Sequence, residues 1–226
     1  ISAGEVDMLF ASYQFLAMVA KGNVWVLVNS NNANLLGDGS SSADTDWHKV
    51  KTDASNDLTK VIAVRGQVGP SGTGAAMALT EDGEVYTWGS NIYLGDGSTG
   101  RPDNSGTRAT SAFATKMTLP TPTNDGKVVQ IGVTGGSNNA GFINNNSSSN
   151  INNSYYVLIK ADGAETGELW SLGANTHRQL GTFNTTWSTS WQKVLKPASP
   201  DGTGATSHFA DVKMFSVQEH DWGYAG

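Results

Sequence analysis

Short stretches of the chain alternate hydrophobic side chains between two sides, which is the pattern of β-strands. In the clearest stretch, Tyr86 and Trp88 fall on one side of an extended backbone and Val85 falls on the other, because successive side chains of a strand point to opposite faces. Residues 24–27 and 169–172 repeat this arrangement. Both sides are apolar, so we expect each sheet to be covered on both faces, as in radially stacked sheets.

The strand candidates come in groups of four. In the best-defined group they cover about Lys60 to Val64, Ala75 to Leu79, Glu84 to Trp88 and Ala112 to Met117. Glu81-Asp82-Gly83 is a tight hairpin turn between the middle two. This pattern predicts one four-stranded antiparallel sheet for each group.

The group is repeated along the chain. The segments GNVWVLVNS (22–30), GEVYTWGSN (83–91) and GELWSLGAN (167–175) agree in residue type at nearly every position, and a Leu-Gly pair follows each. The segment ahead of them occurs four times, beginning near Val6, Val61, Val128 and Val212. We therefore expect Trp25, Tyr86 and Trp170 at equivalent third-strand sites. The predicted units are residues 5–59, 60–126, 127–210 and a partial 211–226, all within a single repeat domain.

These repeats resemble a known family. The run from Ala76 to Gly97, AMALTEDGEVYTWGSNIYLGDG, is similar to the repeat of the regulator of chromosome condensation family. Reduced versions stand at 155–181, which ends in the family's Gln-Leu-Gly, and at 15–39, where Val28 replaces the usual glycine. The resemblance covers nearly the whole chain.

The resemblance implies an all-β fold of β-propeller-like four-stranded blades, about three repeats plus a partial fourth. Members of the family form β-propellers of commonly about seven blades and serve mainly as interaction platforms. The nuclear founder exchanges nucleotide on a small GTPase and binds chromatin. Those surfaces lie outside the repeat signature, so we do not expect these activities to carry over with the fold.

Three blades cannot close a ring. We therefore expect other protein subunits, or missing parts of the same chain, to complete this one as a sector of a larger propeller. Otherwise the blade faces near Val6 and Val212 would expose apolar sheet to water.

Composition and charge limit the classes of partner that we expect. There are 14 Lys and Arg against 20 Asp and Glu, a net charge of −6, and no basic cluster, so nucleic acid is an unexpected partner. No apolar stretch is long enough for a membrane span. The chain has no cysteine, which excludes disulfides, thiolate metal sites and cysteine nucleophiles.

No motif predicts catalysis, a metal site or a cofactor. The four histidines are scattered without metal-ligand spacing. Asp38 and Asp96 recur at the same repeat position, but a Leu-Gly-Asp-Gly turn lacks the oxygen ligands of a calcium site, which favours turn chemistry. The glycine-rich segment 69–74 lies inside a β repeat and is interpreted as a loop rather than a phosphate cradle.

The most irregular segment is Gly135 to Ser154, rich in Asn and Ser. We expect it to project from the third blade with few core contacts, either as a tolerated surface insertion or as a source of hydrogen-bonding groups for sugars or subunits. The candidate interaction surface combines residues of this segment with aromatic residues expected to be exposed: Phe142, Asn144, Asn145, Asn146, Asn152, Trp187, Trp222 and Tyr224.

Three functions compete. The first is a non-enzymatic structural or adhesive module of a virion tail fibre or bacterial extracellular protein, with a glycan or cell-surface receptor as a further candidate partner. The low charge and the abundance of Asn, Ser, Thr and Gly favour this function. It would place the chain outside the cell or in a virion. The alternative is an intracellular regulatory propeller, such as a small-GTPase exchange factor or scaffold. The third, an enzyme using the propeller channel, has no catalytic constellation behind it.

Overall fold

The computed structural model describes residues 1, 4–12, 14–28, 33–40, 45–68, 74–97, 109–123, 125–134, 153–175, 178–199 and 205–217. In these residues the chain forms three four-stranded antiparallel sheets, one two-stranded sheet and a short 3-10 helix, η1 (Ala33–Leu36). The strands are β1 (Val6–Ser12), β2 (Phe15–Ala20), β3 (Asn23–Val28), β4 (His48–Lys49), β5 (Val61–Val68), β6 (Gly74–Thr80), β7 (Val85–Ile92), β8 (Ala109–Lys116), β9 (Lys127–Thr134), β10 (Ser154–Lys160), β11 (Glu168–Gly173), β12 (Ser188–Lys193), β13 (Leu195–Pro197) and β14 (Ala205–His208).

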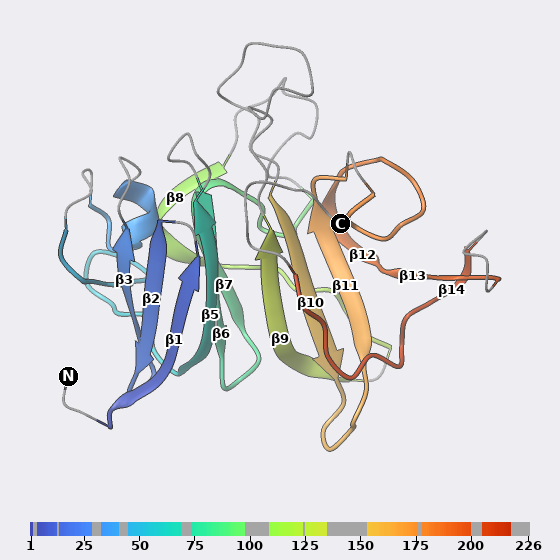
Figure 1. The fold of residues 1–226 in the computed structure, drawn as a ribbon, viewed down its shortest axis with the longest axis horizontal. Helices are drawn as coiled ribbons and strands as arrows, with labels where there is room; N and C mark the ends of the chain where they lie inside the picture. Colours follow the sequence, from blue (N-terminus) through green and yellow to red (C-terminus); the bar gives the residue numbers. More distant parts are fainter. Residues whose placement is uncertain are drawn as a thin grey trace, which may run out of the picture.

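Each four-stranded sheet follows the chain in simple order and is one blade. Blade 1 is β1-β2-β3-β4, blade 2 is β5-β6-β7-β8 and blade 3 is β9-β10-β11-β12. They stand side by side from left to right in Figure 1, with β13 and β14 beyond blade 3. The all-β fold of four-stranded blades is therefore confirmed. The predicted strands of the second group are also present, most of them a few residues longer than the sequence pattern indicates.

The register confirms the repeat alignment. Trp25, Tyr86 and Trp170 all lie on the third strand of their blade. Each is paired with a lysine of the fourth strand, as Trp25↔Lys49, Tyr86↔Lys116 and Trp170↔Lys193. The three units therefore superimpose strand by strand as well as by sequence.

The first strand of each blade carries a β-bulge at the equivalent position. The pairing skips Asp7 in β1, Ile62 in β5 and Val129 in β9. A bulge adds one residue and increases the local twist. The extra residue has no partner on the second strand. Two of these residues have exposed side chains, Ile62 at 52% and Val129 at 39%.

The blades pack face to face through two apolar cores. The first holds buried residues of blades 1 and 2, including Phe15, Val26, Val64 and Trp88. The second lies between blades 2 and 3 and contains residues such as Met77. Each sheet therefore contributes side chains of one face to one core, as the two-sided apolar pattern predicts.

The Leu-Gly closings attach each blade to the next. Gly37 and Gly95 have φ of +71° and +78°, a conformation that favours glycine. A side chain on either would meet a tryptophan of the following blade, since its Cβ would lie 3.0 Å from Trp88 Nε1 or 2.5 Å from Trp191 Nε1. The aspartates that follow form bridges with the fourth strand of the next blade, Asp38↔Phe113 and Asp96↔Ser190. The repeated motif is thus a turn that also contacts the neighbouring blade.

The segment 205–217 lies against blade 3. Val212 exchanges two backbone hydrogen bonds with Gly167, and the Phe215 ring lies 6.2 Å from the Tyr156 ring. Val212 is half-buried there rather than exposed, so the expectation of an open face near Val212 is wrong for the described residues.

The predicted surface segment 135–154 needs a correction at its C-terminal end. Asn153 and Ser154 are fully buried, and Ser154 begins β10. Their polar atoms are satisfied over long sequence distances: Asn153 Oδ1 accepts from Gln67 Nε2 at 3.0 Å, and Ser154 Oγ donates to the Ala174 carbonyl at 2.8 Å. Residues 135–152 lie outside the described residues, so the projection of that part stays a prediction.

Trp88 tests the packing between blades 1 and 2. Its side chain is fully buried and its indole N–H donates to the Leu35 carbonyl at 2.9 Å. Trp88→Ala should lower the free energy of unfolding by about 3–5 kcal/mol, because it leaves a cavity and removes that bond. Trp25→Ala, at a half-buried site, should cost only about 1 kcal/mol. Urea denaturation of both variants measures the difference, and equal losses would contradict the assigned core.

Candidate interaction surface

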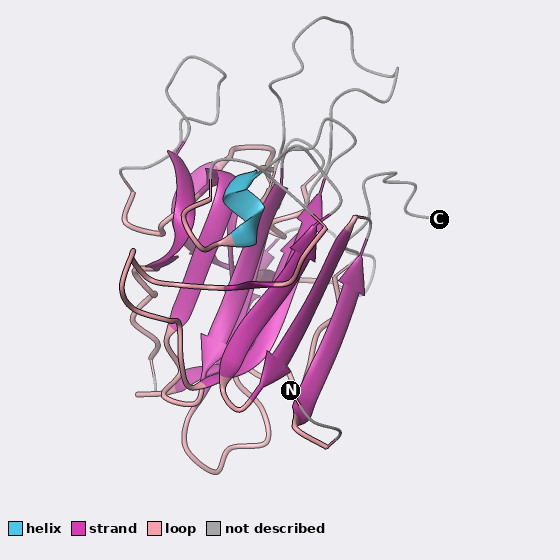
Figure 2. Cartoon of the chain, turned by 90° about the vertical axis from the view of Figure 1, so that its left-hand side faces the viewer, coloured by secondary structure: helices cyan, strands magenta, loops and turns pink. Residues whose placement is uncertain are grey.

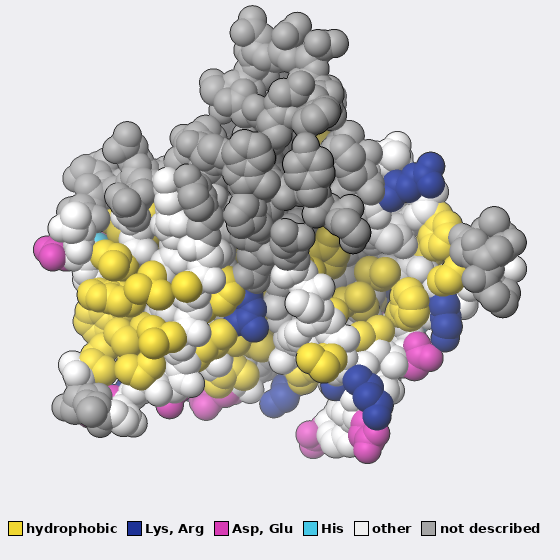
Figure 3. Space-filling model, viewed as in Figure 1, with side chains coloured by type: hydrophobic (Ala, Val, Ile, Leu, Met, Phe, Trp, Pro, Cys, Tyr) yellow, Lys and Arg dark blue, Asp and Glu magenta, His cyan; other side chains and the backbone are white. Residues whose placement is uncertain are grey.

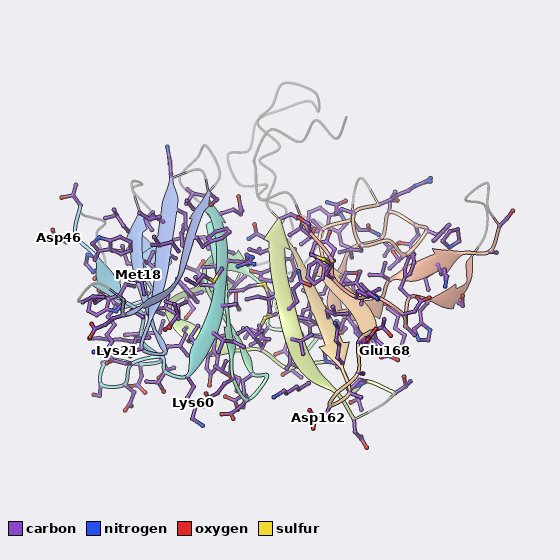
Figure 4. All side chains as sticks on the ribbon, turned by 60° about the horizontal axis from the view of Figure 1, so that its bottom comes forward. Met18, Lys21, Asp46, Lys60, Asp162 and Glu168 are labelled. Carbon is purple, nitrogen blue, oxygen red and sulfur yellow. The ribbon has the colours of Figure 1, made fainter. Side chains whose placement is uncertain are left out.

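The side of blade 1 that faces away from blade 2 is apolar and open. We call Leu9, Leu16, Met18, Trp25 and Leu27 the outer face. They are neighbours across β1, β2 and β3, paired as Leu9↔Met18, Met18↔Trp25 and Leu16↔Leu27. Leu9 is 63% exposed and the others are half-buried. Figure 2 looks onto this side of the sheet, Figure 3 shows hydrophobic side chains gathered over blade 1 at the left, and Figure 4 labels Met18 among them.

The same positions are buried in blade 2. Following the strand pairing, the equivalents of the outer face are Val64, Ala76, Ala78, Tyr86 and Trp88. Tyr86 is half-buried and the other four are fully buried, because blade 1 covers them. No member of the outer face belongs to either core, and no described residue of another blade takes the place that blade 1 takes on blade 2. The outer face thus corresponds, position by position, to a surface of blade 2 that blade 1 covers, and no described residue covers it in the same way.

The charged groups at the margin of the outer face are paired. Lys49 Nζ lies 5.7 Å from the centre of the Trp25 ring and 2.5 Å from Asp57 Oδ2. At the lower end, Lys21 Nζ lies 2.5 Å from Glu5 Oε1. Because each lysine is paired with a carboxylate, the outer face has no local excess of positive or negative charge. It therefore suits an apolar sheet better than a highly charged partner.

A second constellation recurs on the third and fourth strands. In blade 2, Lys116 Nζ lies 2.5 Å from Glu84 Oε1, and Tyr86 donates a hydrogen bond to the other carboxylate oxygen at 3.1 Å. Blade 3 places Glu168, Trp170 and Lys193 in the same pattern, with Lys193 Nζ 5.1 Å from the Trp170 ring centre. The aromatic third-strand residue therefore lies beside an acid and a lysine in both blades.

The blade 3 version is much more buried. The Glu168 side chain is 2% exposed and lies 3.5 Å from both Lys193 Nζ and His208 Nε2. Its carboxylate also accepts hydrogen bonds from the Thr123 hydroxyl and from the Trp170 indole, the latter at 3.2 Å. Figure 4 marks Glu168 near the base of blade 3. The cluster joins the linker that precedes blade 3 to β11, β12 and β14.

These contacts keep Glu168 charged. Burial by itself raises the pKa of a carboxyl group, but the hydrogen bonds from Thr123 and the neighbouring Lys193 hold the pKa of Glu168 below its usual value. Asp38 behaves similarly: despite burial, bonds from Ser40 and His48 lower its pKa. A carboxylate fixed in this way is suited to a structural ion pair and not to a general acid, whose pKa lies near the working pH.

Of the surface predicted from the sequence, only Trp187 lies among the described residues, so the grouping of its residues stays a prediction. Trp187 is half-buried, in the loop before β12, rather than openly exposed. Phe142, Asn144, Asn145, Asn146, Asn152, Trp222 and Tyr224 all lie outside the described residues.

The described residues contain neither a metal-binding group nor a membrane-spanning helix. They hold no group of three or more His, Asp or Glu side chains arranged to bind a metal ion. None of their helices has the length and apolar character needed to cross a membrane.

Comparison with known proteins identifies the repeat. Residues 71–93 match the family model of the regulator of chromosome condensation (RCC1) repeat, and they include the whole of β6 and β7. The fold is that of the RCC1 propellers. No curated protein sequence matches the chain, so this identification rests on the repeat and on solved structures.

Three solved structures are similar to this chain in fold. Human WBSCR16 superimposes with a TM-score of 0.55 and 18% identity, over 85% of this chain and 38% of that one. Yeast RCC1 (Prp20) bound to Kap60 gives 0.51 and 15%, over 97% and 39%. Prp20p from Saccharomyces cerevisiae, studied for binding to Gsp1p and histones, gives 0.54 and 14%, over 87% and 41%. The chain spans about two fifths of each of these relatives.

The Glu168 cluster leads to a pH-dependent prediction of stability. Glu168→Gln should lower the free energy of unfolding by about 2 kcal/mol at pH 7, because the half-buried Lys193 loses its counter-charge and the Thr123 and Trp170 donors lose a charged acceptor. The pKa of Glu168 is lowered in the folded state, so this stability is present above the unfolded pKa of about 4.3 and is lost as pH falls through the lower folded value. The difference from wild type should therefore shrink as pH falls below the unfolded pKa and disappear once Glu168 is protonated in both states.

Glu84→Gln is the matched control, because Glu84 holds the equivalent position with a side chain that is 39% exposed. It should cost less than about 0.5 kcal/mol. Urea titrations at pH 3, 5 and 7 measure both variants. A Glu168→Gln loss that is the same at all three pH values would show that the ion pair is not its cause.

Proposed function

We propose that this chain is a non-enzymatic protein-interaction module, one sector of an RCC1-type propeller that acts by contact. The observation that carries the proposal is the outer face of blade 1, which repeats the surface that blade 1 covers on blade 2 but has no described partner. Exposed apolar sheet of this kind is a recognised association surface.

The expected partner is a protein. The RCC1-type fold supports an interaction module in general, and Prp20p is a protein studied for its binding to Gsp1p and histones. Of the two functions expected from the sequence, the comparisons therefore favour the regulatory or scaffold propeller. None of them supports the virion or adhesive interpretation or a glycan receptor, and an extracellular location stays a prediction from composition.

Charging the outer face tests the proposal. Leu16 and Leu27 are directly opposite each other on β2 and β3, so Leu16→Glu with Leu27→Lys keeps a favourable cross-strand pair while making the surface polar. The unmodified chain should self-associate at micromolar concentration and bind an apolar dye. The double variant should be monomeric, should bind several-fold less dye, and should unfold within about 1 kcal/mol of wild type. Sedimentation velocity and dye fluorescence are the measurements.

Phe183→Asn is the control. Phe183 is 41% exposed, far along the chain from blade 1, and has a φ of +59° that asparagine tolerates. It should leave association and dye binding unchanged. A wild-type chain that is monomeric and binds no dye, or a double variant that associates as strongly as wild type, would contradict the proposal.

A further inference from the structure

The partner of the outer face can be described more closely, because the structure contains two complete blade-to-blade contacts for comparison. At each contact the first two strands of one blade approach the first strand of the next, as β1 and β2 approach β5 and as β5 and β6 approach β9. The strand pairing makes Phe15 of β2 equivalent to Ala75 of β6, since they pair with Val28 and Gly89 at the same place on the third strand. The two contacts can therefore be compared position by position.

The first contact combines a large residue with small ones. Phe15 is 2% exposed and lies directly over Gly66 of β5, where an added Cβ would be only 2.6 Å from two ring atoms. Ala76 pairs with Gly66, and Ala78 follows it on the same face. The phenylalanine fits because blade 2 has almost no side-chain volume beneath it.

The second contact reverses the sizes. Here blade 2 contributes Ala75 in the place of Phe15. Blade 3 contributes Val133 in the place of Gly66, and Tyr155 and Val157 in the places of Ala76 and Ala78. Tyr155 is fully buried, with its hydroxyl 3.3 Å from that of Thr87. At this position, close packing thus pairs a large side chain on one blade with small ones on the other.

The outer face of blade 1 belongs to the second type. Ala11, paired with Leu16, stands in the place of Gly66 and Val133. Leu16 and Met18 stand where blade 2 has Ala76 and Ala78. A phenylalanine placed over Ala11 as Phe15 lies over Gly66 would meet a Cβ at a distance that real structures do not show.

We infer that the outer face accepts an RCC1-type blade that carries alanine, and not phenylalanine, at the Phe15 position of its second strand. This inference rests on the proposed function, because it names the partner of the same surface. The required sequence on the facing strand is of the Ala75-x-Met77 kind. The Phe15-x-Ala17 kind is excluded by size. The relatives are more than twice as long as the matched region, so an RCC1-type protein has room for such a blade.

The experiment adds one blade in front of the full chain. In one extended chain, a copy of residues 60–126 is joined directly to Glu5, which keeps the natural linker that leads from blade 2 into the next first strand. In the other, a copy of residues 5–59 is joined there with its own natural linker. The first added blade presents alanine and the second presents phenylalanine at the decisive position.

A single cysteine reports on the outer face. The chain has none, so Leu9→Cys gives one thiol at a position that is 63% exposed and whose blade 2 equivalent, Val64, is fully buried. Its labelling rate with a maleimide should fall at least tenfold when the added blade carries alanine, and by less than twofold when it carries phenylalanine. Asp162→Cys, in an exposed turn of blade 3, should label at the same rate in every chain and so controls for reagent access and folding.

Size-swap variants complete the test. Ala75→Phe in the added copy should restore fast labelling. Ala11→Gly with Leu16→Ala in blade 1 should let the phenylalanine-bearing blade protect the thiol. Equal protection by both added blades would overturn the size rule while leaving the proposed function intact. If neither blade protects the thiol in chains that fold, the outer face does not accept a blade and the proposed function fails as well.

Discussion

A four-stranded sheet with apolar side chains on both faces is stable in water only when another layer covers each face. This requirement explains most features of the chain. It accounts for the stacking of blades 1, 2 and 3 and for the two separate apolar cores. It also explains why the Leu-Gly turns reach the next blade, since Gly37 and Gly95 fit beneath Trp88 and Trp191 and hold neighbouring sheets at packing distance.

Within that constraint, side-chain size decides which sheet can follow which. Phe15 needs Gly66 beneath it, whereas at the second contact the small Ala75 stands in the place of Phe15 and blade 3 carries the larger Val133 and Tyr155. The two contacts distribute large and small side chains differently at this position, as close packing requires. The blades are therefore equivalent in backbone and register but not interchangeable, and this difference gives the series of sheets a defined order.

The sequence predicts the part of this structure that depends on local pattern. Alternation and the repeated glycines locate the strands and identify Trp25, Tyr86 and Trp170 as equivalent. Features formed by residues far apart in the sequence cannot be predicted from this pattern. Asn153 lies in a loop-like sequence but is buried and hydrogen-bonded to Gln67. Glu168 is charged in the interior because Thr123, Lys193 and Trp170 surround its carboxylate. The alternation shows that both faces of a blade are apolar, but only the three-dimensional register shows which face of blade 1 is open.

The occupied faces also limit how two copies of the chain can meet. The faces of blades 1 and 2 that point along the series are covered by blades 2 and 3, and on blade 3 the corresponding surface is contacted by Val212 and Phe215. Among the described residues, the outer face is therefore the blade face that remains open to a second copy. Contact between identical surfaces is isologous and closes as a dimer rather than growing into a fibre. Leu16 and Met18 would then meet side chains of their own size across the two-fold axis, which packs less closely than a large side against a small one. The outer face is thus better matched to another blade than to itself, and self-association of the isolated chain reports that the surface is open without being its best use.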